Sequence, residues 1–157
     1  MQNLSYAIIY ALIWLVSKMP FFLLYRISDL MYILVYYVTP YRKNVVINNL
    51  KNAFPEKSDA EIRNIAKKFY HHLCDFLLES VKPFTISRKE IGRRFRYMNL
   101  EIFENFNREK RNFAVVSGHY GNWELNHNLT HYANREGIVI YRPLQNEIMD
   151  RIFKKIR

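Results

Sequence analysis

The stretch 111-RNFAVVSGHYGNWEL-125 decides the expected fold of this chain. Residues 113–117 form a short apolar run of the kind found in buried strands, and the run stops at two glycines that flank a histidine. A segment with helical spacing follows from Trp123. The stretch therefore predicts a strand, a tight turn that carries His119, and the first turn of a helix.

The same alternation of strand and helix extends to both sides of this stretch. Further strands are expected at 94–98 and 138–141, and helices at 100–106, 123–133 and 146–156. Alternating β and α segments imply a sheet that is at least partly parallel, and ligands of such sheets bind beyond the carboxyl ends of the strands. The expected fold class is therefore α/β, with His119 just past a strand end.

The region before this alternation is expected to be helical. A short basic amphipathic helix should begin with Thr39 as its N-cap. Ser58 and Glu61 form a capping box, as do Ser87 and Glu90 further on. The first box opens a long helix whose apolar residues share one face: Ile62, Ile65, Phe69, Leu73, Phe76, Leu77 and Ser80.

The first 38 residues are strongly apolar. Residues 1–17 carry no charge, and 21–38 carry only Arg26 and Asp29. A spanning helix needs about 20 apolar residues, so each segment is expected to span a membrane or to lie in its interface, with a pair of buried core helices as the alternative. A signal peptide is disfavoured because no basic region precedes the apolar residues and no cleavage site follows them.

The charge of the chain is concentrated after this apolar region. Nearly all of the formal net charge of +10 lies beyond Thr39, which favours the cytoplasmic side for residues 39–157. A basic surface attracts acidic lipid, nucleic acid or an acidic carrier protein. No nucleic-acid-binding motif is present, so no nucleic acid partner is expected. The single cysteine, Cys74, excludes an internal disulfide and is expected to be a small buried apolar residue.

His119 and Glu124 are candidates for catalysis. On one continuous helix they would lie about 140° apart, at about 100° per residue. If His119 lies in the turn and Glu124 in the first turn of a helix that Asn122 caps, the two side chains can converge. A carboxylate on one imidazole nitrogen fixes the tautomer and leaves the other nitrogen free to take a proton from a hydroxyl. The His-x4-Glu spacing has low specificity by itself.

Other histidines permit an alternative chemistry. Glu124, His127 and His131 share one stripe of the expected helix, so a metal-dependent hydrolase that uses these three ligands stays open. Their spacing matches no zinc signature, and the assignment leaves His119 without a role. His71 and His72 are expected at the edge of the long helix, with no chemical role.

Several blocks in the same order make the chain similar to the late acyltransferases of lipid A biosynthesis. These enzymes are the lauroyl and myristoyl transferases within the wider lysophospholipid acyltransferase-like group. The similar blocks are the apolar N-terminus, RKNVVINNLKNAFPEKSDAEI at 42–62, a helix that ends in Glu79, SGHYGNWE at 117–124 with its HX4E motif, and YRPLQNEIMDRIFKKIR at 141–157.

This resemblance implies acyl transfer at the cytoplasmic face of the inner membrane. The donor would be an acyl carrier protein thioester and the acceptor a hydroxyl of a phosphorylated lipid A precursor. His119 would be the general base and Glu124 would orient it. Arg142 and Arg157 would contact the phosphate or the carrier, and we group Asn122 with them as substrate-binding. The resemblance implies neither a metal nor an organic cofactor.

The resemblance also bears on domain organisation. Members of the family are longer than this chain, which resembles their N-terminal part. We expect residues 1–38 to form membrane-associated helices and 39–157 to form an incomplete α/β acyltransferase domain, and whether this chain is active or inactive by itself stays open. The alternatives are a catalytically dead membrane-anchored interaction module and an acyltransferase that acts on another membrane lipid.

Overall fold

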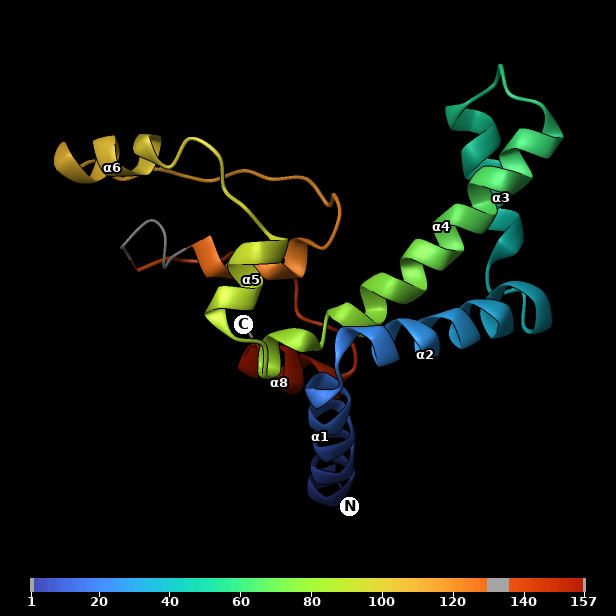
Figure 1. Cartoon of the computed structure of the whole chain (residues 1–157), viewed down its shortest axis with the longest axis horizontal. Helices are drawn as coiled ribbons and strands as arrows, with labels where there is room; N and C mark the ends of the chain where they lie inside the picture. Colours follow the sequence, from blue (N-terminus) through green and yellow to red (C-terminus); the bar gives the residue numbers. More distant parts are fainter. Residues whose placement is uncertain (1, 130–135, 157) are drawn as a thin grey trace. The chain divides into compact units, whose positions relative to one another are not determined.

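The computed structural model describes residues 2–129 and 136–156, and helices dominate it (Figure 1). The chain divides into two compact units. One unit is Met19–Glu79, and the other combines Met1–Lys18 with Ser80–Arg157. The described residues of both units contain no β-strand.

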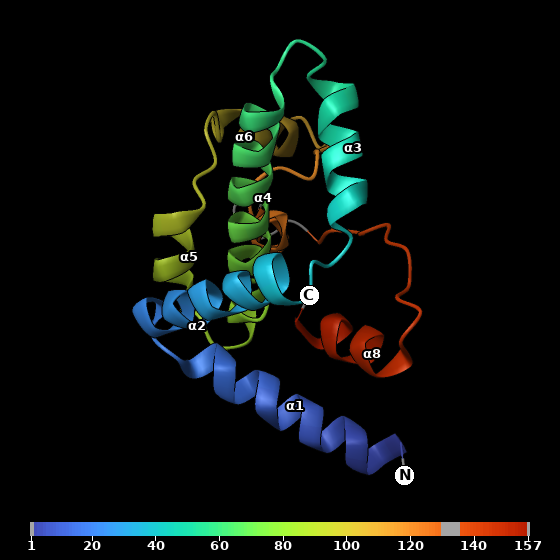
Figure 2. The same cartoon turned by 90° about the vertical axis from the view of Figure 1, so that its right-hand side faces the viewer.

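The unit Met19–Glu79 is built on one long helix, α4, against which α2 and α3 pack. Figure 2 shows α3 beside α4. The last turn of α2 widens into the π-helical turn η1. The element bounds are Phe21–Ile33 for α2, Leu34–Val38 for η1, Lys43–Ala53 for α3 and Asp59–Glu79 for α4.

The start of α4 has the predicted capping box. The Ser58 backbone N–H donates to Glu61 Oε2 at 2.9 Å, and the Glu61 N–H donates to Ser58 Oγ at 3.4 Å. The two residues thus satisfy backbone donors that a helix start leaves without partners. Cys74 is buried on this helix, as predicted.

The predicted apolar face of α4 coincides only in part with the buried one, since Ile62 is buried and two other members are exposed. Phe69 and Leu77 are 42% and 49% exposed. Apolar side chains surround much of this helix, so the contact with α2 and α3 decides which stripe is covered. The buried residues of α4 recur every four positions: Ile62, Ala66, Tyr70 and Cys74.

The predicted N-cap of α3 is also wrong. Thr39 ends η1, where its Oγ1 donates to the Leu34 carbonyl at 3.1 Å. Helix α3 begins only at Lys43, after Arg42 in a left-handed conformation with φ 51°. The Thr39 hydroxyl closes the preceding helix and is therefore unable to cap the next one.

The unit that combines Met1–Lys18 with Ser80–Arg157 contains most of the short elements. The helices predicted around 100–106 and 146–156 are present, and Ser87 Oγ accepts the Glu90 N–H at 3.2 Å as the second capping box requires. The element bounds are Gln2–Lys18 for α1, Lys82–Phe84 for η2, Arg88–Arg94 for α5, Glu101–Arg108 for α6, Trp123–Asn128 for η3 and Glu147–Ile156 for α8.

The α/β prediction is not confirmed. The segments 113–117 and 138–141 are irregular, and 94–98 begins at the end of α5 and continues without regular structure. Val116 and Ile140 are 93% and 98% exposed. A strand satisfies its backbone only by pairing with a neighbour, and none of these segments has such a neighbour within the described residues. The sheet prediction is therefore not confirmed for the described part of this chain.

The two predicted apolar helices are present at the N-terminus. Among the described residues, Phe21–Val38 is long and apolar enough to cross a membrane, with a mean hydropathy of 1.4 and 17% of the stretch buried. Helix α1 is a shorter apolar helix. The low burial of Phe21–Val38 favours a membrane partner over a core position, while the choice between spanning and interfacial placement stays a prediction.

Candidate active site

The turn that carries His119 is formed largely as predicted. The Tyr120 N–H donates to the Gly118 carbonyl at 3.0 Å, which folds the backbone tightly at the histidine. Gly121 has φ 58°, a left-handed conformation that glycine adopts readily and that a Cβ would strain. The second glycine is therefore required by the turn itself, before any contact with a substrate is considered.

The His119 side chain is exposed and leans on an aromatic ring. Its imidazole packs edge-on against Trp123, with ring centroids 4.6 Å apart and an interplanar angle of 68°. Aromatic pairs prefer this edge-to-face arrangement. Trp123 is the first residue of η3, so the start of that short helix fixes the orientation of the imidazole.

Glu124 follows directly and is only 9% exposed. It lies in the first turn of η3, as the sequence predicted for the start of a helix. A hydrogen bond between His119 and Glu124 is not among the contacts that the structure gives to the described part of the chain. The structure thus places His119 in the turn and Glu124 in the short helix that follows it. Their pairing stays a prediction.

Asn122 occupies the N-cap position of η3, but its side chain makes no capping hydrogen bond. Its backbone carbonyl accepts the Leu125 N–H at 3.2 Å. The prediction of a side-chain cap is therefore wrong, because the tight 3₁₀ turn uses the main chain at this point. The assignment of Asn122 to substrate binding stays a prediction.

Sequence patterns did not reveal the contact that holds η3 in place. The Tyr97 hydroxyl donates to the Asn126 carbonyl at 3.0 Å and lies 2.8 Å from Asn126 Oδ1. These residues are 29 positions apart. Leu125, the apolar residue between Glu124 and Asn126 in the sequence, is buried at 6% exposed. A single tyrosine from the segment after α5 thus supports the helix that presents Glu124.

The two predicted arginines differ in what the structure describes. Arg142 is exposed on an irregular segment that α8 holds in place, since Asp150 Oδ1 accepts the Leu144 N–H at 2.9 Å. Asn146 caps α8 by accepting the Met149 N–H at 3.0 Å. Arg157 lies outside the described residues.

The alternative metal site is only partly covered by the structure. His131 lies outside the described residues, and the side chain of His127 is not described. Within residues 2–129 and 136–156, no group of three or more His, Cys, Asp or Glu side chains is placed to hold a metal ion.

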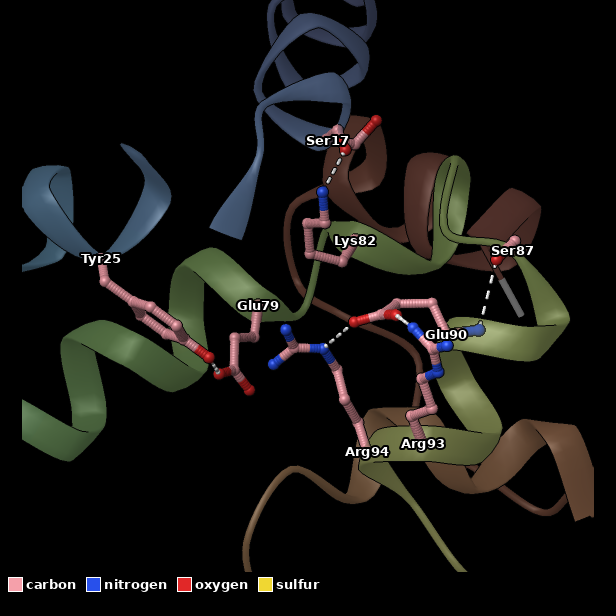
Figure 3. Close-up of polar contacts among 8 residues, drawn as sticks. All are labelled: Ser17, Tyr25, Glu79, Lys82, Ser87, Glu90, Arg93 and Arg94. Carbon is pink, nitrogen blue, oxygen red and sulfur yellow. Dashed lines mark hydrogen bonds and ion pairs between the residues drawn. The ribbon is translucent and has the colours of Figure 1, made fainter. Parts of the chain in front are cut away.

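His71 makes contacts that the sequence analysis did not anticipate. Its Nε2 is 3.0 Å from Asp29 Oδ1 and its Nδ1 is 3.2 Å from Asp75 Oδ2. Each ring nitrogen of His71 thus faces one carboxylate oxygen. A second link between α2 and α4 runs from the Tyr25 hydroxyl to Glu79 Oε1 at 2.6 Å (Figure 3). The contacts of His71 and the bond between Tyr25 and Glu79 therefore both join α2 to α4.

Comparisons with known proteins identify the family of this chain. A family model described as bacterial lipid A biosynthesis acyltransferase matches residues 1–157. The chain is 27% identical over 139 residues to the lipid A biosynthesis lauroyltransferase of Escherichia coli (strain K12). The matched residues cover 88% of this chain and 45% of that relative. It thus spans less than half the length of the relative. No solved structure matches the chain. This chain belongs to the bacterial lipid A biosynthesis acyltransferase family.

Proposed function

We propose that this chain acts in the transfer of a fatty acyl group from an acyl carrier protein thioester to a hydroxyl of a lipid A precursor. The observation that carries the proposal is the family match over residues 1–157 together with an exposed histidine in a glycine-flanked turn. The relative of known activity is a lauroyltransferase, which supports a fatty acyl group as the unit that is moved.

His119 is the general base of the proposed reaction. Its free imidazole nitrogen takes the proton of the acceptor hydroxyl, and the hydroxyl oxygen attacks the thioester carbonyl. The tetrahedral oxyanion collapses, the ester bond forms, the bond from carbon to sulfur breaks, and the imidazolium returns the proton to the leaving thiolate. Exposure of His119 supports this role because a bulky lipid hydroxyl has to reach the ring.

Glu124 is the proposed partner of His119. A buried carboxylate that binds the second ring nitrogen would fix the tautomer and stabilise the imidazolium. The low exposure of Glu124 supports the role, because a charge pair is stronger where little water screens it. The two residues are close in sequence, since one lies in the turn and the other in the short helix that follows it.

Substrate binding is assigned to Asn122, Arg142 and Arg157. Guanidinium groups bind phosphate oxygens with paired hydrogen bonds, which suits a phosphorylated glycolipid. The net charge of +10 suits an acidic carrier protein. The apolar helices α1 and α2 suit a site at the cytoplasmic face of the inner membrane.

The α/β architecture is proposed for the whole protein. Residues 113–117 and 138–141 keep the apolar composition of strands and expose it, as Val116 and Ile140 show. Strands that come from outside the described residues would satisfy their backbone groups and cover their side chains. This completion would also place the His119 turn at the carboxyl end of a strand.

The test is an acyl transfer assay with an acyl carrier protein thioester and a lipid A precursor. The 157-residue chain is compared with a protein extended by any downstream coding sequence. We expect transfer by the extended protein and little or none by the short chain. Transfer only to a different membrane lipid would establish the alternative acceptor. If neither protein transferred an acyl group although both associated with membranes, the result would instead favour the non-catalytic module.

A further inference from the structure

Helix α1 has one covered face and one bare face, although both are apolar. Tyr6, Tyr10, Ile13 and Ser17 lie on the covered face, and Ser17 is fully buried. The opposite stripe lies about 180° away, at about 100° per residue. It consists of Leu4, Ile8, Leu12 and Leu15, which are 68%, 52%, 58% and 55% exposed.

The covered face of α1 is occupied by helix α8. The Arg151 guanidinium lies 4.1 Å from the centre of the Tyr6 ring, and Lys155 Nζ lies 4.7 Å from the centre of the Tyr10 ring. Cations are attracted to aromatic faces at these distances. The aromatic side of α1 is thereby held against its own unit. The leucine and isoleucine stripe stays exposed and suits an apolar partner, such as lipid acyl chains.

A buried lysine fixes what lies next to the C-terminal end of α1. Lys82 is only 6% exposed, and its Nζ donates to the Ser17 carbonyl at 2.8 Å (Figure 3). Thr85 Oγ1 donates to the same oxygen at 2.6 Å. Carbonyls in the last turn of a helix lack partners within the helix, and a cation is favourable there. Burial lowers the pKa of Lys82, so the ammonium is held in this contact at a cost in desolvation.

The segment that begins six residues after Lys82 is strongly basic. Residues 88–96, named here the basic segment, contain five Arg or Lys residues and one Glu. Glu90 pairs with Arg94 at 2.8 Å and with Arg93 at 3.6 Å, as Figure 3 shows. Ile91 is buried and anchors α5. The exposed cations outside this carboxylate cluster are Arg88, Lys89 and Arg96.

We propose that the basic segment binds the headgroups of anionic lipids at the membrane surface on which the bare face of α1 lies. The inference rests on the membrane association contained in the proposed function. The bond between Lys82 and Ser17 holds the basic segment beside the end of an apolar helix, which is where headgroups meet acyl chains. Each Lys or Arg close to an anionic surface strengthens binding by about fivefold.

The bare apolar stripe in the same unit selects a lipid surface over other acidic partners. An acidic protein would be attracted by the same charges but would require no bare apolar helix face. A bilayer offers both chemistries at once, with acyl chains for Leu4 and Leu12 and phosphates for Arg88 and Lys89. The proposal therefore assigns the charge and the apolar stripe of this unit to one lipid partner.

The experiment measures binding of the 157-residue chain to phosphatidylcholine vesicles with and without phosphatidylglycerol. The variant Arg88→Gln, Lys89→Gln, Arg96→Gln should bind the anionic vesicles about 100-fold more weakly, since each charge contributes about fivefold, and should bind the neutral vesicles as before. The charge-matched control is Arg63→Gln, Lys67→Gln, Lys68→Gln on exposed positions of α4, and we expect it to lose much less. Circular dichroism verifies that both variants keep their helices.

Several results would overturn the inference. An equal loss in the α4 control would attribute the effect to net charge alone. Binding that does not respond to phosphatidylglycerol would remove the lipid assignment. Loss of acyl carrier protein binding in the basic-segment variant, with vesicle binding unchanged, would assign the surface to the carrier. Because the measurement requires no turnover, a failed acyl transfer assay leaves it interpretable, whereas a wild-type chain that binds no vesicle would contradict the membrane association as well.

Discussion

Helix α4 and the segment 111–122 are both rich in apolar side chains, and they differ in what completes them. Helix α4 satisfies its own backbone and buries Ile62 and Tyr70 against α2 and α3 within one unit. Within the segment 111–122, residues 113–117 pair with no strand among the described residues, and Val116 is exposed. The comparison teaches that local chemistry is sufficient for a helix, while a strand requires a neighbour that local sequence does not supply.

Amide hydrogen exchange should show the largest difference between these two regions. In the 157-residue chain we expect the central amides of α4 to exchange slower than those of 113–117 by on the order of a thousandfold, because only the former are held by backbone hydrogen bonds in a packed helix. In the extended protein, residues 113–117 should gain protection. Strong protection of 113–117 in the short chain would contradict the claim that this segment requires a strand partner from elsewhere.

The next effect concerns the stability of the unit Met19–Glu79. Ile62→Ala removes a side chain that is 1% exposed and should lower the free energy of unfolding by about 2–5 kcal/mol. Leu77→Ala is the matched control, because Leu77 lies on the same helix and is 49% exposed. Urea unfolding measures both variants. Equal losses would mean that the predicted stripe, and not the observed one, faces the core.

A smaller effect should appear at the capping box of α4. The hydrogen bonds from Ser58 lower the pKa of Glu61 below its ordinary value of 4.5. A depressed pKa in the folded state stabilises the protein above the ordinary value, and this contribution is lost as the pH falls through the folded pKa. The free energy of unfolding should therefore decrease as the pH is lowered from about 6 to about 3, the range in which glutamate side chains titrate.

The control for this pH effect is Ser58→Ala, which removes the side-chain hydroxyl that bonds to Glu61. The variant should be less stable at neutral pH and should lose less stability on acidification. If the free energy of unfolding of the wild-type chain and of the variant fell in parallel with pH, the bond from the Ser58 hydroxyl would not be the cause of the pH dependence.

Much of the helical structure follows from local sequence. The Ser58 capping box, the Ser87 cap of α5, the apolar pair at the N-terminus and the helices near 100–106 and 146–156 are present as predicted. Such signals work because a cap and the donor it satisfies are three residues apart. The buried stripe of α4 was predicted only in part, because packing against α2 and α3 decides which of its apolar residues are covered.

Contacts between distant residues could not be predicted in the same way. His71 meets Asp29 across 42 positions, and Lys82 meets Ser17 across 65. Neither pair has a spacing that marks it in the sequence. The turn at His119 was predictable because glycine at a left-handed position has a local cause, while the strands on either side of it depend on partners from elsewhere.

The measurement that tests the central claim most directly is the turnover number of His119→Ala in the extended, active protein. The account predicts a loss of about 10²- to 10⁴-fold in kcat, the range of general base catalysis, with membrane binding unchanged. His72→Ala, an exposed histidine on α4, should retain normal turnover as the control. Normal turnover of His119→Ala would contradict the general-base assignment.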